Sequence, residues 1–265
     1  MTDDGRDEAT DPSGQEAPGG DPAPSGTGAD AAPFGDSGDI LGRLRARLDA
    51  VGLGPSGLDV RPPLDPQGRT LAAGLILLYP RRDPAAGTAA PHLVLTRRTA
   101  TLRRHSGQIS LPGGRHDGAD GSLLRTALRE THEELGVAPE GLAIWGRLEP
   151  EWIVVTHYLL APYIAYAPRR PEFRPAPAEV AEVIEVPLAT LLDPATLAEE
   201  TWELAGVPRQ VHFYRYGEHK IWGATARVLS KLAALLAPVG GPGTGAAARI
   251  QPGLVLPERT RPLDT

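Results

Sequence analysis

The part of this sequence that most constrains the fold is a helical segment that follows a glycine-rich loop, within residues 111–137, LPGGRHDGADGSLLRTALRETHEELGV. At roughly 100° per residue, Glu130, Glu133 and Glu134 fall within about 100° of arc on one side of such a helix. Most of the apolar residues of 123–135 fall on the opposite side. One face can therefore pack while the other gathers three carboxylates, so the segment predicts a helix with one buried and one acidic face.

The ends of this helix carry their own signals. Ser122 is suited to be the N-cap, because its side chain can accept a backbone hydrogen bond. Gly136 stands where helices commonly end in a left-handed residue. Arg129 lies four residues before Glu133 and can pair with it. Before the helix, residues 112–114 (Pro-Gly-Gly) allow the backbone to approach a ligand or a metal closely.

Three carboxylates at this spacing suggest a bound cation. Like charges three and four residues apart destabilise an isolated helix, and a divalent cation reverses that repulsion. Mg²⁺ and Mn²⁺ prefer carboxylate oxygens, and Mg²⁺ sites keep waters and recruit substrate phosphates. A solvated surface helix is the alternative, and R-E-x-x-E-E alone favours it. The preceding glycine loop and the trailing glycine favour the metal site instead.

The rest of the chain predicts one mixed α/β domain over 38–237. Strand-like runs lie on both sides of the central helix, which is the pattern of a mixed sheet with helices. Asp39 is suited to cap a first helix. The other expected elements are strands within 71–79, 92–97, 142–149, 152–166 and 209–216, and a last helix over 222–236.

The two ends of the chain have a different composition. Residues 1–37 and 238–265 have little to bury, so we expect disordered tails. Residues 1–39 hold ten acids and one arginine and therefore carry a net charge of −9. Because the whole chain has a net charge of −6, the remainder carries +3. A mildly basic body suits an anionic small substrate and is too weakly charged to indicate nucleic acid.

Composition excludes several other classes of site and location. The chain has no cysteine, which removes disulfides, thiolate metal sites and cysteine nucleophiles. No run approaches the roughly 18 apolar residues of a membrane span, and no secretory signal begins the chain. We therefore expect a cytoplasmic protein without a membrane partner. The oligomeric state stays open, with a homodimer as one option.

The segment 111–137 resembles the Nudix box, whose family pattern is G-x5-E-x7-R-E-U-x-E-E-x-G-U with U apolar. The matching residues are Arg129, Glu130, Glu133, Glu134, Gly136 and Val137. Asp120 stands where the pattern has Glu, eight residues in place of seven separate it from Arg129, and Thr131 replaces an apolar residue. A one-residue insertion of this kind is shared by one subfamily.

That subfamily is the coenzyme A pyrophosphatase-like Nudix hydrolases, whose upstream signature is roughly L-L-T-x-R-S-x-x-L-R-x-H-x-G-Q-x-x-F-P-G-G-x-x-D-x-x-D. The matching stretches are Leu95–Arg98, Leu102–Gln108 and Leu111–Gly114, followed by Asp117 and Asp120. Arg98 replaces Ser and Leu111 replaces Phe. Residues 221–226 also look like this subfamily's entry into the last helix. The resemblance covers about residues 40–237.

The resemblance implies the Nudix α/β/α sandwich with a mixed sheet and the box as a loop-helix-loop. It implies Mg²⁺- or Mn²⁺-dependent hydrolysis of coenzyme A to 3′,5′-ADP and 4′-phosphopantetheine. Glu130 and Glu134 would be the principal metal ligands, and the Gly113 carbonyl would add another. Glu133 would be a third ligand or a water-orienting base, and Arg129 would orient the acidic face.

Other residues are candidates for contact with the substrate. These are Arg97, Arg103, His105, Gln108 and Gly114, because arginine suits bidentate binding of phosphate and the glycine permits close approach. The alternative is that some of them brace the loop; Arg98 and Arg104 are weaker candidates for contact. Any one of Glu179, Glu182 and Glu185 could supply a remote base, and surface acids explain them equally well.

Two other functions remain open at this point. One is a Nudix hydrolase of another nucleoside diphosphate derivative, such as NADH or ADP-ribose, because the box fixes the metal and the bond but not the attached group. The other is a non-catalytic module that senses a nucleotide. Loss of the box carboxylates would be the usual mark of such a module, and here all three are present.

Overall fold

The computed structural model describes residues 36–56, 58, 68–82, 87–100, 107–204 and 206–237. Residues 1–35 and 238–265 lie outside this part, so the expected disorder of the tails stays a prediction. The helices are α1 (Asp36–Ala50), α2 (Leu123–Leu135) and α3 (Gly223–Leu236). The strands are β1 (Thr70–Arg82), β2 (Ala89–Arg98), β3 (Ile109–Ser110), β4 (Gly113–Arg115), β5 (Ala143–Arg147), β6 (Glu151–Ile153), β7 (Tyr158–Tyr166), β8 (Val180–Pro187), β9 (Leu197–Leu204), β10 (Val207–Tyr216) and β11 (His219–Trp222).

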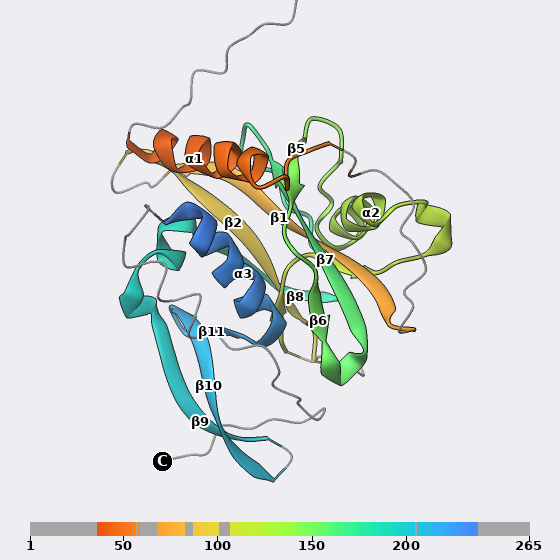
Figure 1. Cartoon of the computed structure of the whole chain (residues 1–265), viewed down its shortest axis with the longest axis vertical. Coiled ribbons are helices and arrows are strands. Elements are labelled where there is room, and N and C mark those ends of the chain that lie inside the picture. Colours follow the sequence, from red (N-terminus) through yellow and green to blue (C-terminus); the bar gives the residue numbers. More distant parts are fainter. Residues whose placement is uncertain are drawn as a thin grey trace, which may run out of the picture. The chain divides into compact units, whose positions relative to one another are not determined.

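The described residues form an eight-stranded mixed sheet around β1, with the strand order β3-β2-β1-β7-β5 (Figure 1). β1 and β7 run parallel, with Leu75 opposite Tyr163, and the other pairs are antiparallel. β4 pairs with β1, β6 with β7, and β8 with β2. Residues 72–79 of β1 are all buried, as expected for a continuous apolar strand covered on both faces.

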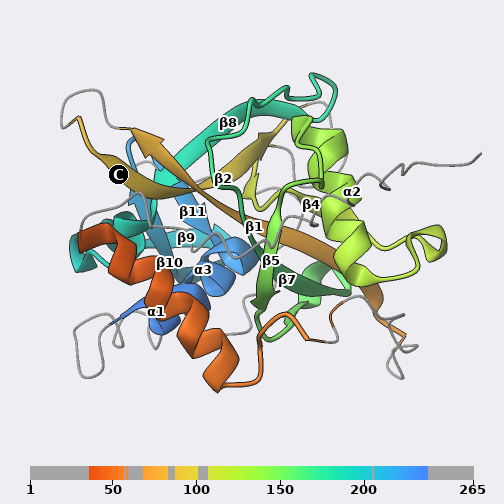
Figure 2. The same cartoon turned by 90° about the horizontal axis from the view of Figure 1, so that it is seen from above.

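Helices cover both faces of this sheet, which confirms the α/β/α sandwich (Figure 2). Side chains of successive strand residues point to opposite faces. Ile76 of β1 accordingly lies in one apolar core with Leu44 of α1 and Leu229 of α3. Leu75 lies in the other core, with Leu135 of α2. No helix in the described ranges has the length and hydropathy needed to cross a membrane.

Helix α1 begins earlier than the sequence suggested. It starts at Asp36, so Asp39 lies inside the helix and the prediction that Asp39 caps it is wrong. The expected domain start at residue 38 likewise falls within the first turn. Near the other end, the Arg47 guanidinium donates to the carbonyl oxygens of Leu235 and Ala237, at 2.9 and 2.5 Å. A cation at this position satisfies carbonyls that the end of α3 leaves without helical partners.

We expect Arg47→Met to destabilise the fold by about 1–3 kcal/mol, because methionine keeps the aliphatic stem but removes charged hydrogen bonds to the end of α3. Arg45→Met, at an exposed position of the same helix, is the matched control. Urea denaturation of both variants measures the difference. Equal midpoints for the two variants would show that Arg47 does not hold α1 against α3.

A separate three-stranded antiparallel sheet has the order β11-β10-β9. Figure 1 shows its β9–β10 hairpin extending away from the larger sheet. The Trp202 ring contacts Phe213 and Trp222, with centroids 6.3 and 5.1 Å apart. The sequence predicted only the β10 strand of this sheet, and it also missed β3, β4 and β8 of the larger one.

Candidate active site

Helix α2 spans Leu123–Leu135, the range expected from the sequence, and both of its ends are fixed. The Ser122 hydroxyl accepts from the Arg125 N–H at 3.2 Å, and Gly136 closes the helix with φ of 70°, so both cap predictions are confirmed. The loop after β7 satisfies two further carbonyls. The N–H groups of Arg174 and Ala176 donate to the oxygens of residues 135 and 134, at 2.7 and 2.9 Å.

The glycine loop lies directly against the acidic part of α2. Gly113 pairs with Gly74 of β1, and a Cβ on Gly113 would overlap the carbonyl oxygen of Ala73. A Cβ on Gly114 would overlap the carboxyl carbon of Glu130. These glycines thus permit a close approach of the loop to the protein's own strand and helix, and the expected approach to a ligand or a metal stays a prediction.

Glu134 is the most deeply buried carboxylate of the site, with 2% of its surface exposed. Its Oε2 accepts from the Gly113 N–H at 3.4 Å, and its Oε1 lies 3.3 Å from Nη1 of Arg98. Burial raises the pKa of Glu134 to about 7, although the Arg98 charge and the Gly113 hydrogen bond oppose the rise. The fold therefore holds a carboxyl group that ionises only at a free-energy cost.

Glu130 and Glu133 differ from each other in environment. Burial raises the pKa of Glu130, whose carboxylate is 17% exposed and lies 2.9 Å from Nη2 of Arg129. Glu133 is 57% exposed and accepts from Nη1 of Arg129 at 2.9 Å, which confirms the expected pair. The exposure of the three carboxylates thus increases from Glu134 through Glu130 to Glu133.

Arg129 links these glutamates to the loop that precedes α2. Its Nε and Nη2 donate to Oδ1 and Oδ2 of Asp120, at 2.7 and 3.1 Å. The hydrogen bond from Arg129 holds the pKa of Asp120 at about 2, well below its usual range. Asp120 also accepts from the Thr126 hydroxyl and from the Asp117 N–H. Arg129 therefore connects Glu130 and Glu133 to Asp120 of the preceding loop, and its role in orienting the acidic face stays a prediction.

A divalent cation fits the chemistry of Glu130 and Glu134. Both carboxyl groups are desolvated, both have raised pKa values, and both lie beside a backbone loop without side chains. A hard cation would stabilise their charged forms. Within the described residues, no three His, Asp or Glu side chains already form a metal-binding group. Glu133 in particular is directed to Arg129, so a cation here would complete its shell with water, carbonyl or phosphate oxygens.

An open hollow of about 680 Å³ lies beside the acidic face of α2, where it is lined by Glu130 and Glu133 but not by the buried Glu134. Its polar lining residues are Arg115, His116, Asp117, Asp120, Arg129, Glu130 and Glu133. Nδ1 of His116 lies 2.7 Å from the Thr126 hydroxyl, so this imidazole braces the loop. Arg115 and His116 were not predicted as site residues, although their position directly after the two glycines was an available signal.

The predicted substrate contacts are only partly described. Arg103 and His105 lie outside the described residues, as does Arg104. Nε of Arg97 donates to Glu182 at 2.8 Å, and Glu182 also lies 3.3 Å from His219. The Gln108 carbonyl accepts from the backbone N–H of Arg98 at 3.0 Å, at the base of the loop between β2 and β3.

The structure brings Arg98 and Glu179 to the carboxylates, which spacing along the chain did not predict. Arg98 was a weak candidate, yet its guanidinium contacts Glu134 and lies 3.9 Å from Glu179. The charge of Glu179 contributes to the raised pKa values of both Glu130 and Glu134. Glu185, by contrast, accepts hydrogen bonds from Tyr79 and Arg170, away from these groups.

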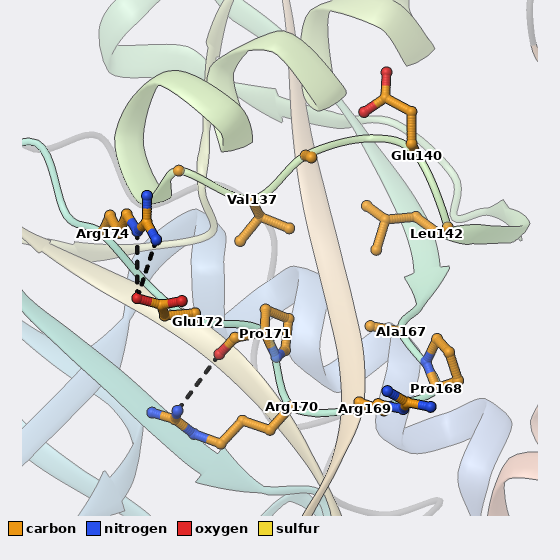
Figure 3. A pocket seen from close by; sticks show the side chains of 13 residues that line it. Val137, Glu140, Leu142, Ala167, Pro168, Arg169, Arg170, Pro171, Glu172 and Arg174 are labelled. Carbon is orange, nitrogen blue, oxygen red and sulfur yellow. Dashed lines mark hydrogen bonds and ion pairs between the residues drawn. The ribbon is translucent and has the colours of Figure 1, made fainter.

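A second hollow, of about 630 Å³, lies at the C-terminal end of α2 (Figure 3). Its walls come from residues 136–142 and 167–174. Arg174 pairs with Glu172, and Arg170 donates to Glu185 and to the Pro171 carbonyl. This second hollow is lined by neither Glu130 nor Glu133, whereas both line the first, so we place the candidate active site at the first hollow.

Several known proteins are similar to this chain. The model of the NUDIX domain family matches residues 68–209. A protein of Photorhabdus laumondii, described as uncharacterized Nudix hydrolase NudL, is 39% identical over 143 residues, which cover 54% of this chain and 76% of that protein. The NudL protein of Enterobacter sp. strain 638 is 34% identical, over 64% of this chain and 84% of its own. The Nudix hydrolase RenU from M. Smegmatis, known from a crystal structure, is 26% identical, with a TM-score of 0.38 over 46% of this chain and 73% of that one.

Proposed function

Because this chain belongs to the Nudix hydrolase family, we propose that it hydrolyses the diphosphate bond of coenzyme A or an acyl-coenzyme A, using a divalent cation held by Glu130 and Glu134. Nudix hydrolases as a family use divalent metal ions and act on nucleotide derivatives. For this chain, coenzyme A as the substrate, Mg²⁺ or Mn²⁺ as the ion, and Glu130 and Glu134 as its ligands are proposed.

One observation carries the proposed site: two desolvated carboxylates with raised pKa values lie together against a glycine loop. A buried carboxylate that only balances a structural arginine has its pKa lowered, as Glu185 has. Glu134 and Glu130 have the opposite shift, so the local partners do not offset their desolvation. Bound positive charge would offset it, which supports a cation at this position.

The residues of the site divide the work of hydrolysis. A bound divalent cation would supply charge neutralisation for the phosphoryl oxygens and a lowered pKa for a bound water. Glu130 and Glu134 would hold it, together with the Gly113 carbonyl. Glu133 is exposed to the hollow and is placed to orient or deprotonate the attacking water. Arg129 keeps Glu130 and Glu133 in position through Asp120.

Sequence supports the choice of coenzyme A. The stretch from Leu95 to Gly114 resembles the upstream signature of the coenzyme A pyrophosphatase-like subfamily. In the proposed reaction, water attacks the diphosphate and the products are 3′,5′-ADP and 4′-phosphopantetheine. Arg97, Arg103, His105, Gln108 and Gly114 are the proposed substrate contacts. Glu179 is a candidate remote base because its charge already acts on Glu130 and Glu134.

A substrate panel tests this proposal. Turnover of coenzyme A, dephospho-coenzyme A, NADH and ADP-ribose is measured by product chromatography, with Mg²⁺, with Mn²⁺ and with EDTA. We expect coenzyme A to give the highest kcat/KM, and EDTA to abolish turnover of every substrate.

Each other result has a distinct meaning. Higher kcat/KM for NADH or ADP-ribose would keep the site but replace the substrate. Metal-dependent binding of these nucleotides without turnover would identify a nucleotide sensor, which the intact Glu130, Glu133 and Glu134 disfavour. Turnover that persists unchanged in EDTA after extensive dialysis would refute the metal-dependent mechanism.

A further inference from the structure

We propose that Arg98 is a built-in counter-ion that competes with the divalent cation for Glu134 and thereby sets the metal affinity of the site. This inference rests on the proposed function, because it concerns the cation held at Glu134. It adds a positioning residue on β2 that lies outside the segment 111–137.

The contacts of Arg98 support this role. Its Nη1 lies 3.3 Å from Oε1 of Glu134, whose side chain is 2% exposed. The other Glu134 oxygen faces the Gly113 N–H. Within the described part of the chain, Oε2 thus faces a backbone N–H and Oε1 faces a full positive charge. A cation that coordinates Glu134 through Oε1 must share that oxygen with the guanidinium or displace it.

Arg98 also has a second carboxylate to which it can remain attached. Its Nη2 lies 3.9 Å from Oε2 of Glu179, which is 49% exposed. A guanidinium that leaves Glu134 therefore keeps an anionic partner at the edge of the site. The backbone of Arg98 is fixed as well, because its N–H and C=O pair with Gln108 and Gly107. The side chain can move between two acids while the strand stays in place.

Electrostatics gives the direction of the effect. Two positive charges close to one carboxylate repel each other, and the repulsion is little screened where water is excluded. Arg98 therefore stabilises the Glu134 carboxylate while the cation is absent and weakens the binding of the cation. A purely structural arginine would have the opposite effect on removal, because a misplaced Glu134 would bind metal less well.

Mn²⁺ binding by the full-length protein tests the proposal. Dissociation constants come from isothermal titration calorimetry and from electron paramagnetic resonance of free Mn²⁺. We expect Arg98→Gln to tighten Mn²⁺ binding by about tenfold or more, since a neighbouring charge shifts proton binding to a carboxylate by about one to three log units. Arg98→Lys keeps the charge and should bind Mn²⁺ as the wild type does.

A matched control removes an equivalent ion pair elsewhere. Arg170 is exposed and pairs with the partly buried Glu185, at 2.8 Å, on the side of the second hollow. Arg170→Gln should leave the Mn²⁺ dissociation constant unchanged. Thermal unfolding in EDTA checks folding: Arg98→Gln should lower the melting temperature, and Mn²⁺ should raise it by more than it does in the wild type.

Failure of this inference is distinguishable from failure of the proposed function. If Glu134→Gln removes Mn²⁺ binding but Arg98→Gln binds as tightly as the wild type or more weakly, the counter-ion role is wrong and the metal site stands. If Glu134→Gln binds Mn²⁺ as tightly as the wild type, the metal site itself is wrong, and the role of Arg98 falls with it.

Discussion

Glu134→Gln should lower kcat for diphosphate hydrolysis by at least about a thousandfold and, in EDTA, should make the protein more stable than the wild type. The loss of activity follows from losing a charged ligand at the centre of the proposed site, since amide oxygen binds a divalent cation far more weakly than carboxylate. The gain in stability follows from burial, because glutamine brings the same shape into the interior without a charge.

The pH dependence of this gain has a definite sign. The pKa of Glu134 is raised from 4.5 to about 7, so the folded state favours the protonated form. The loss of folding stability caused by ionised Glu134 is absent below about pH 4.5, grows between pH 4.5 and pH 7, and reaches its full size above pH 7. At pH 8 the difference corresponds to about 3 kcal/mol in favour of Glu134→Gln. Urea denaturation in EDTA at pH 5 and pH 8 measures it.

Glu185→Gln is the control, because Glu185 is another largely buried glutamate with its pKa shifted in the opposite direction. Hydrogen bonds from Arg170 and Tyr79 lower that pKa despite desolvation. Its replacement should therefore destabilise the protein at pH 8. Destabilisation of both variants to the same extent would mean that the Glu134 carboxylate is satisfied by its surroundings and is not held ready for a cation.

Gly114→Ala should reduce hydrolysis by about a hundredfold with little change in the melting temperature in EDTA. The new methyl group would overlap the carboxyl end of Glu130, which is the flexible end of a side chain and can move aside. Folding therefore survives, but Glu130 loses its position, and displacement of a reacting group by about 1 Å can cost this much in rate.

Gly113→Ala provides the contrast. Its Cβ would overlap the backbone of Ala73 in the central strand, and Gly113 has φ of 152°. Because the backbone of the central strand β1 can move only at a large free-energy cost, this variant should lose stability as well as activity. Equal melting temperatures for the two alanine variants, or full activity of Gly114→Ala, would contradict the assigned geometry of the glycine loop.

The local part of the site was predictable from the sequence because its determinants are local. Helix α2, its Ser122 and Gly136 caps and the Arg129–Glu133 pair depend on residues a few positions apart. Periodicity and capping chemistry fix these features directly. The order of apolar strands and helices indicated a mixed α/β domain, and the α/β/α sandwich was what the resemblance to the Nudix family implied.

The remainder of the site depends on contacts between segments distant in the chain. Arg98 meets Glu134 because β2, β1 and α2 pack together, and Glu179 joins them through the loop that precedes β8. No spacing rule carries that information. Likewise, strand β9 has the sequence LAEETWEL, in which the acidic residues interrupt the alternation of apolar and polar side chains. Strand β11 has only four residues, which is too short for a clear pattern. Pairing with β10 stabilises both strands, so tertiary contacts decided their structure.

The most direct measurement of the central claim is an anomalous difference map from a crystal of the wild-type protein soaked in Mn²⁺. We expect a peak within coordination distance of the carboxylates of Glu130 and Glu134, beside Gly113, with the Arg98 guanidinium withdrawn toward Glu179. A map from an enzyme shown to be active with Mn²⁺ that has no peak at these two carboxylates, or has its peak elsewhere, would contradict the account.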